Sequence, residues 1–400
     1  MKPLTLVSHI WQVLRSQWRW LVPGMGVKRW IGLMLLGATL GGLGIAYVLI
    51  DVYRTDPMPA VISTLTLQFL PRLWRAALLG LAGLAALVVA VAQINRSLQN
   101  VVEAGNEHRR RGRGPRIVAI GGGTGLSTLL RGLKKRTSNL TAIVTVADDG
   151  GSSGRLRQSL GVLPPGDFRN CIAALSDDES LIAQLFQYRF GGAQDLGGHS
   201  FGNLFITVMA EVTGSFERAL LESSKVLNIR GQVLPATLKD VTLVGELEGE
   251  GRQMSVVEGE SKITTTPGAI RRVYLRPDDA PAYPGVIRAL LEADLIVLGP
   301  GSLYTSLMPN LLVPDLTAAI KSSRALKVYV CNTATQPGET EGYTVLAHVQ
   351  AIERHTEPGL FPIVLANARQ AGQLLAGLEW VRLDPAPNGR RHLILADLIY

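Results

Sequence analysis

Residues 116–126 read Arg-Ile-Val-Ala-Ile-Gly-Gly-Gly-Thr-Gly-Leu, and this stretch decides the fold. Its apolar run is followed at once by glycines, and Leu126, Leu129, Leu130 and Leu133 then recur at helical spacing. The pattern predicts a buried parallel strand, a tight glycine turn and a helix. Such a turn points backbone N–H groups and a helix N-terminus at a phosphate, and glycines let the anion come close.

The turn supplies the first candidate phosphate-binding residues. Known fingerprints match only in part, because a dinucleotide G-x-G-x-x-G needs glycine where Leu126 stands, and the Gly-Lys-Ser/Thr of a P-loop is absent. An NAD-dependent dehydrogenase, which the fold alone would suggest, is therefore disfavoured. A turn that only packs helix on sheet is the alternative. The candidates are Gly121, Gly122, Gly123, Thr124 and Gly125.

The charge of the 400-residue chain is unevenly distributed. The net charge is +8, but residues 1–116 hold 14 Lys/Arg against 4 Asp/Glu, and the rest holds 26 against 28. The globular part therefore lacks the overall basic character of a nucleic-acid-binding domain. The two cysteines, Cys171 and Cys331, have apolar neighbours, which is typical of buried, reduced thiols.

Two uncharged runs, Trp30–Ile50 and Ala76–Ile94, are each long enough to cross a hydrocarbon core of about 30 Å. They predict a membrane anchor over residues 1–95, with transmembrane helices at about 30–50 and 74–94. A signal peptide would leave the second run unexplained. A buried helical hairpin inside the globular domain is the remaining alternative.

The stretch 96–115 is a basic linker that includes Arg109-Arg110-Arg111-Gly112-Arg113. Together with the five Lys/Arg of residues 1–29, it places both termini and the α/β domain in the cytoplasm, at the inner membrane. We expect the linker to lie against anionic lipid headgroups. A nucleic-acid-binding arm is the alternative, but the adjacent span favours the lipid bilayer, and we expect no nucleic acid partner.

The second strand, at 141–147, ends in Asp148-Asp149-Gly150-Gly151-Ser152-Ser153. Ligands lie at the carboxyl ends of the strands in doubly wound sheets, where an acid on the second strand often holds a ribose. The two aspartates alternatively predict a weak Mg²⁺ site, or simply a turn. The candidates here are Asp148, Asp149, Gly151, Ser152 and Ser153.

Four later loops repeat the pattern of small polar residues beside a predicted strand or helix. For Asp167 an N-cap role is the alternative, and for His199 a structural one. Because several strands end in such loops, the sequence predicts a cleft along one sheet edge. The candidates are Asp167, Arg169, Asn170, His199, Asn203, Gly299, Gly301, Ser302 and Asn332.

These elements together predict an α/β fold. We expect a Rossmann-like, doubly wound, mostly parallel sheet over residues 116–400, with a β-rich insertion at about 230–276, preceded by two transmembrane helices.

Six motifs, spread over roughly residues 115–370, resemble those of the YvcK-type gluconeogenesis factors. These are relatives of CofD, the 2-phospho-L-lactate transferase of deazaflavin coenzyme synthesis. The membrane hairpin lies outside the resemblance. The motifs are Gly121–Gly125, Ala147–Gly154, Pro164–Asn170, His199–Asn203, Gly299–Tyr304 and Asn332–Glu339.

The resemblance implies a UDP-sugar ligand such as UDP-N-acetylglucosamine, and a regulatory role that links carbon metabolism to cell-wall synthesis and cell shape. It assigns the glycine turn, Asp148, Asp149, Asp167 and Asn203 to ligand binding. Because no complete nucleophile–base set is visible, we expect a regulator without turnover. The alternative is a CofD-like transferase that acts on a deazaflavin precursor with Mg²⁺. The identity of the sugar, a homo-oligomer and the protein partner stay open.

Overall fold

The computed structural model describes residues 114–176, 181–192, 196–372, 374–375, 377–384 and 392–398, and scattered positions between 38 and 81. The chain divides into two units, Met1–Asn100 and Val101–Tyr400. The predicted transmembrane helices and the linker lie almost wholly outside the described residues. Within the described part, no helix has the length and apolar character needed to cross a membrane.

The decisive stretch folds as predicted. Strand β1, Ile117–Gly121, is buried along its whole length, and helix α5, Gly123–Leu133, begins two residues later. Leu126 and Leu130 of α5 are fully buried against the sheet. Gly123 has φ +61°, a left-handed conformation that favours glycine, which is why the chain can turn so sharply here.

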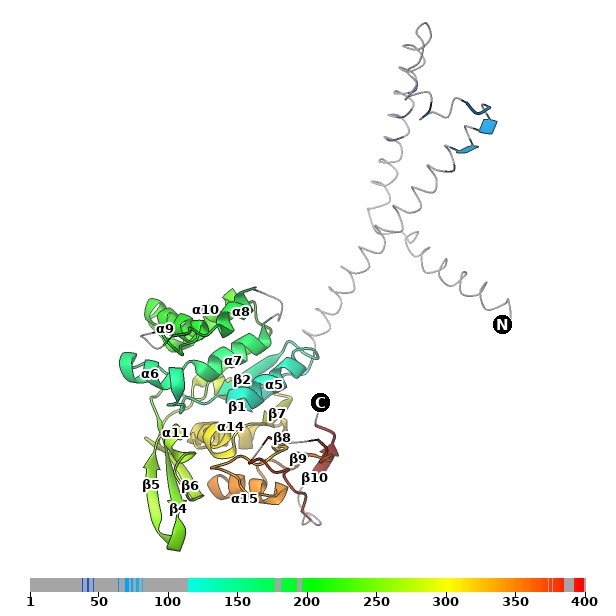
Figure 1. The fold of residues 1–400 in the computed structure, drawn as a ribbon. Helices are drawn as coiled ribbons and strands as arrows, with labels where there is room; N and C mark the ends of the chain where they lie inside the picture. The colour runs from blue at the N-terminus through cyan, green and yellow to red at the C-terminus, as the bar shows by residue number, and fades with distance from the viewer. Residues whose placement is uncertain are drawn as a thin grey trace, which may run out of the picture. The chain divides into compact units, whose positions relative to one another are not determined.

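The α/β fold with a parallel sheet is confirmed (Figure 1). Seven strands pair in the order β10-β9-β8-β7-β1-β2-β3, and every pair is parallel. After β1 the chain adds β2 and β3 on one side of that strand. It later adds β7, β8, β9 and β10 on the other side, so the topological switch point lies between β1 and β7. The added strands are β2 (Leu140–Val144), β3 (Gln232–Pro235), β7 (Leu295–Leu298), β8 (Leu326–Val330), β9 (Ile363–Asn367) and β10 (His392–Ala396).

Helices cover both faces of this sheet. Crossovers between parallel strands are right-handed, so connections that run in opposite directions along the sheet place their helices on opposite faces. Helices α5 and α7 pack together on one face, and α8, α9 and α10 gather against α7 (Figure 1). Helices α12 and α14 pack against each other, and α12 also contacts β3 at the edge of the sheet. Their bounds are α6 Gly151–Leu160, α7 Gly166–Leu175, α8 Leu181–Gln187, α9 Phe201–Thr213, α10 Phe216–Val226, α12 Pro284–Glu292, α13 Met308–Leu311, α14 Pro314–Ser322 and α15 Val345–His355.

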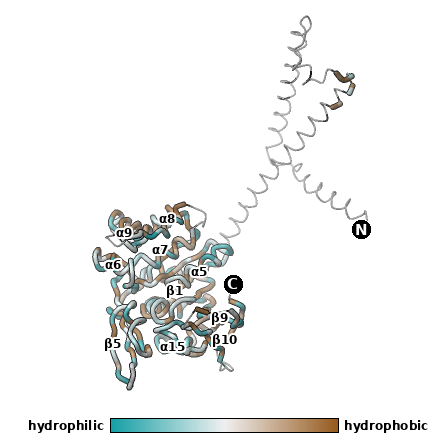
Figure 2. Tube along the Cα trace, viewed as in Figure 1, coloured by the Kyte–Doolittle hydropathy of each residue, from teal (hydrophilic) through white to brown (hydrophobic). Residues whose placement is uncertain are grey.

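Hydrophobic residues recur along the strands and helices of this unit (Figure 2), and the buried ones form a single core cluster. Both cysteines lie in it, buried and unbridged, as predicted. The burial of apolar side chains on both faces of β1 and β2 explains why these strands read as continuous apolar runs.

The β-rich insertion is a separate antiparallel sheet, with strand order β5-β4-β6. The predicted start at about residue 230 is wrong, because β3 joins the main sheet as a parallel partner of β2. A short strand with β-branched residues does not reveal which sheet it joins. The insertion comprises β4 (Thr242–Glu248), η2 (Glu250–Arg252), β5 (Met254–Glu258), α11 (Glu260–Ile263) and β6 (Ala269–Arg276).

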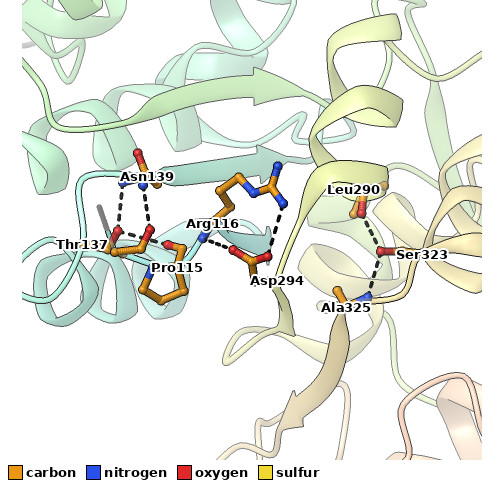
Figure 3. A network of polar contacts seen from close by, with 9 residues as sticks. Pro115, Arg116, Thr137, Asn139, Leu290, Asp294, Ser323 and Ala325 are labelled. Atoms are coloured by element: carbon orange, nitrogen blue, oxygen red, sulfur yellow. Dashed lines mark hydrogen bonds and ion pairs between the residues drawn. The ribbon is translucent and has the colours of Figure 1, made fainter. Parts of the chain in front are cut away.

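Polar contacts fasten the amino edge of the sheet, opposite the predicted cleft (Figure 3). The Arg116 N–H donates to Asp294 at 2.8 Å, and its guanidinium donates to the same carboxylate at 3.2 Å. Thr137 Oγ1 donates to the Pro115 carbonyl and accepts from the Asn139 N–H, both at 3.0 Å. A cavity of about 440 Å³ opens at this edge, and Gln232 and Thr141 in its lining bond each other at 2.9 Å.

Candidate functional site

Four carboxyl groups lie close enough to influence one another electrostatically beyond the carboxyl ends of β1 and β2. We call Asp148, Asp149, Asp167 and Glu260 the carboxylate cluster. Burial, and next the charge of Asp148, raise the pKa of Asp167 to about 6. Burial, followed by the charges of Asp148 and Asp149, raises the pKa of Glu260 to about 8. Burial and the neighbouring carboxylates therefore both favour the protonated forms of Asp167 and Glu260.

Backbone amides hold three of these carboxylates in place. The Gly150 N–H donates to Asp148 at 2.9 Å, and the Ser261 N–H donates to Asp149 at 2.9 Å. The second bond docks α11 of the insertion onto the cluster and brings Glu260 with it. Sequence reasoning missed Glu260, because a glutamate in an inserted segment looks like any surface acid until the fold places it.

The alternative role considered for Asp167 was that of N-cap to its own helix. The structure does not show this role. The N-cap of α7 is Pro165, and the Asp167 carboxylate accepts instead from the Gly123 N–H at the start of α5. Gly122 leaves room for it, since a Cβ there would lie 2.5 Å from Asp167 Oδ2. A helix N-terminus stabilises a carboxylate as it does a phosphate. The first free amide of the glycine turn is thus paired with the protein's own carboxylate.

A cavity of about 610 Å³ lies at the switch point, on the other side of the α5 start. Thr124 and Gly125 line it from α5, Pro300 lines it from the loop after β7, and Asn332 lines it from the end of β8. Most of the remaining lining is apolar. We call it the switch-point cavity; its lining includes three predicted site residues, Thr124, Gly125 and Asn332, which come from two of the motifs. The other lining residues are Thr128, Leu129, Gly132, Leu133, Val330, Cys331, Thr333, Ala334, Leu365 and Leu398.

Asn332 shapes the cavity through the loop that holds Gly299, Gly301 and Ser302. Its Oδ1 accepts from the Gly301 N–H at 3.1 Å, and its Nδ2 donates to the Gly301 carbonyl at 2.9 Å. Both ends of the amide are therefore engaged by the protein itself. Glu339 supports the π-helical turn η3, Leu303–Leu307, in a similar way, by accepting from the Tyr304 N–H at 3.0 Å.

A second group of predicted residues meets where α6, α7 and α9 converge. We call Ser152, Arg169, His199 and Asn203 the polar junction. Ser152 Oγ lies 2.9 Å from His199 Nδ1 and accepts from Asn203 Nδ2 at 3.0 Å. Arg169 donates to Asn170 Oδ1 at 2.7 Å. Burial and then Arg189 lower the pKa of Arg169 to about 10, and burial and then Arg155 lower the pKa of His199.

The geometry gives no defined metal centre. Among the described residues, no three His, Cys, Asp or Glu side chains are arranged to hold a metal ion. Asp148 and Asp149, which the sequence suggested for Mg²⁺, each already accept a backbone N–H.

The raised pKa values predict a pH-dependent stability. The folded chain keeps protons on Asp167 and Glu260 up to about pH 6 and 8, although the ordinary pKa values are 3.8 and 4.5. Their contribution is therefore full below about pH 4 and is lost as pH rises toward 8. Without divalent cations, urea unfolding should show a falling free energy of unfolding, and Glu260→Gln should flatten this decline. An unchanged profile in Glu260→Gln would contradict the carboxylate cluster.

The family model of the 2-phospho-L-lactate transferase CofD matches residues 117–392. Among curated relatives, a putative gluconeogenesis factor of Nostoc sp. is 50% identical over 409 residues, covering 96% of this chain and 88% of the relative. That match therefore takes in most of the N-terminal region as well. The gluconeogenesis factor of Bacillus subtilis is 53% identical over 257 residues, and the match covers 64% of this chain and 80% of that relative.

The solved structures agree with this. A crystal structure of a protein from Bacillus halodurans superposes with a TM-score of 0.66 at 46% identity. It covers 71% of this chain and 93% of that one.

Proposed function

The chain belongs to the CofD-like family, among the gluconeogenesis factors, and from this premise we propose that it is a UDP-sugar-binding regulatory factor. The observation that supports this most is the switch-point cavity beside the α5 start. Open α/β sheets bind nucleotides at this place, because there the helices on the two sides of the switch point diverge.

The cavity suits the nucleoside end of such a ligand. Its volume of about 610 Å³ lies within the usual range of ligand pockets, which is about 300–1,000 Å³. The apolar side chains of Leu129, Leu133 and Leu398 can cover a flat base, while Thr124 and Thr128 offer hydroxyl groups.

Isothermal titration of the full-length chain tests this proposal. We expect UDP-N-acetylglucosamine or a closely related UDP-sugar to bind at micromolar concentration. NAD should not bind, since Leu126 replaces the third glycine of the dinucleotide fingerprint. Absence of binding to every UDP-sugar would refute the function.

A CofD-like transferase is the second candidate, and the carboxylate cluster is the observation that favours it. Acidic side chains near a diphosphate are suited to hold Mg²⁺, which neutralises charge that develops during transfer. Incubation with a deazaflavin precursor, the activated phospholactate nucleotide and Mg²⁺ distinguishes the candidates. Transferred product would establish the enzyme, and its absence together with UDP-sugar binding would favour the regulator.

We further propose that residues 1–95 tether the chain to the inner membrane, with the α/β unit in the cytoplasm. The support is the two uncharged runs and the excess of Lys/Arg at their cytoplasmic flanks. The full-length chain should therefore sediment with membranes and resist extraction by high salt. Recovery in the salt wash would refute the tether. The proposed link to cell-wall synthesis predicts altered cell shape when the gene is lost during growth on gluconeogenic carbon sources.

A further inference from the structure

Strand β10 stands at one end of the seven-stranded sheet, and no described strand pairs with its outer side (Figure 1). Natural proteins usually protect such an edge with a charged residue or a proline, which discourages pairing with another chain. β10 reads His-Leu-Ile-Leu-Ala and carries no Lys, Arg, Asp, Glu or Pro. Its backbone therefore lacks the usual devices that prevent a further strand from joining the sheet.

Apolar side chains of β10 are exposed on both faces of the sheet. Ile394 and Leu395 point to opposite faces, because side chains alternate along a strand, and each is 49% exposed. Strands of a parallel sheet are normally buried on both faces by helices, as β1 and β2 are here. The described residues that follow β9 contain no helix that could cover β10 in this way.

The hydrogen bonds to β9 show which backbone groups of β10 face outward. The His392 N–H donates to the Pro362 carbonyl at 2.9 Å, and the Ala396 carbonyl accepts from a residue just after β9 at 2.8 Å. A residue of a parallel strand directs its N–H and C=O to the same neighbour, and the next residue directs them to the other side. Leu393 and Leu395 therefore present their N–H and C=O groups at the outer edge.

The strand is complementary to a second copy of itself. Leu393 and Leu395 flank Ile394 symmetrically, so an antiparallel copy related by a two-fold axis at Ile394 can exchange N–H···O=C bonds with both. Two arginines directly precede the strand in the sequence, and Asp397 directly follows it. Asp397 lies at the surface, where it also pairs with Arg369 at 3.1 Å. Antiparallel pairing brings the basic start of one strand to the acidic end of the other, which favours this register.

We propose that β10 pairs antiparallel with β10 of a second copy of this chain, with the two-fold axis at Ile394. The two seven-stranded sheets then form one continuous sheet, and the exposed side chains of Ile394 and Leu395 are covered by the second copy. A pair of five-residue strands lies at the small end of specific interfaces, below about 1,200 Å² in total, so we expect a dimer that dissociates on dilution. The proposal does not depend on the ligand of the switch-point cavity.

Disulfide trapping of the full-length chain tests the register. Ile394 would face its own copy in a non-hydrogen-bonded pair, where Cβ atoms approach to about 4.5 Å, which is within reach of a disulfide. Ile394→Cys should therefore form a covalent dimer under mild oxidation at least about 10-fold faster than Leu291→Cys. Leu291 is the matched control, because it is 51% exposed on α12, which contacts β3 at the other end of the sheet. The two native cysteines are buried and do not compete.

A second variant tests the backbone bonds. Proline has no N–H, and the N–H of residue 395 faces the outer edge, so Leu395→Pro removes a donor to the second copy and leaves the hydrogen bonds to β9 in place. Added to Ile394→Cys, it should slow cross-linking about 10-fold. Equal cross-linking of Ile394→Cys and Leu291→Cys would overturn the proposal, and so would cross-linking that Leu395→Pro leaves unchanged. The first comparison needs no proline, so it decides the matter even if Leu395→Pro disturbs the fold.

Discussion

Replacing Gly125 by alanine should destabilise the folded chain by about 2–3 kcal/mol, the usual cost of forcing an extra methyl group into a packed site. A Cβ at this position would lie 2.5 Å from the Pro300 carbonyl oxygen and 2.8 Å from its carbon. Both atoms are backbone, so neither can rotate away. The substitution must push α5 apart from the loop after β7, which is the seam at which the two halves of the sheet meet.

Gly132→Ala is the matched control, because it lies in the same helix with nothing within 4 Å of an added Cβ. Alanine is a better helix former than glycine, so this change should stabilise the chain by about 0.5–1 kcal/mol. Urea unfolding of both variants gives the comparison. Equal stabilities would show that α5 does not pack on the Pro300 loop as described.

Thr128→Trp should reduce UDP-sugar affinity by about 100-fold or more, by filling the switch-point cavity with an indole ring, since a ligand loses its whole contact surface there. Thr128 is exposed on α5, and its hydroxyl donates to the Thr124 carbonyl in the same helix, at 2.9 Å. Stability should therefore change little, which separates loss of binding from loss of folding.

Arg131→Trp is the control for this second substitution. It introduces the same indole on the same helix at an exposed position outside the cavity lining. Calorimetric titration of both variants with UDP-N-acetylglucosamine should show normal binding for Arg131→Trp. Normal binding by Thr128→Trp as well would place the nucleotide outside the switch-point cavity.

The central strand, turn and helix could be predicted because the signal is local. Apolar residues of β1, glycines and helical leucines each specify their own backbone conformation. The parallel character of the sheet followed for the same reason, from continuous apolar strands. The membership of β3 could not be predicted, since its four residues fit either sheet and only pairing with β2 decides.

The candidate site shows the same limit. The sequence predicted that Asp148, Asp167 and Asn203 lie near one edge of the sheet. It did not predict which carboxylate oxygen accepts from which backbone amide. The bond from Gly123 to Asp167 joins a turn to a helix 44 residues later, and no local pattern predicts it. Glu260 reaches the cluster only because α11 docks through Asp149. Such side-chain partners are set by tertiary packing, which periodicity does not encode.

Hydrogen–deuterium exchange of the full-length chain, with and without saturating UDP-N-acetylglucosamine, tests most directly whether the nucleotide binds at the carboxyl edge of the sheet. We predict slower exchange at residues 122–126, 148–154, 299–302 and 331–334, which form the switch-point cavity and the adjoining loops. Protection confined to residues 138–141 and 231–232, at the cavity on the amino edge, would contradict the account, as would no protection at all.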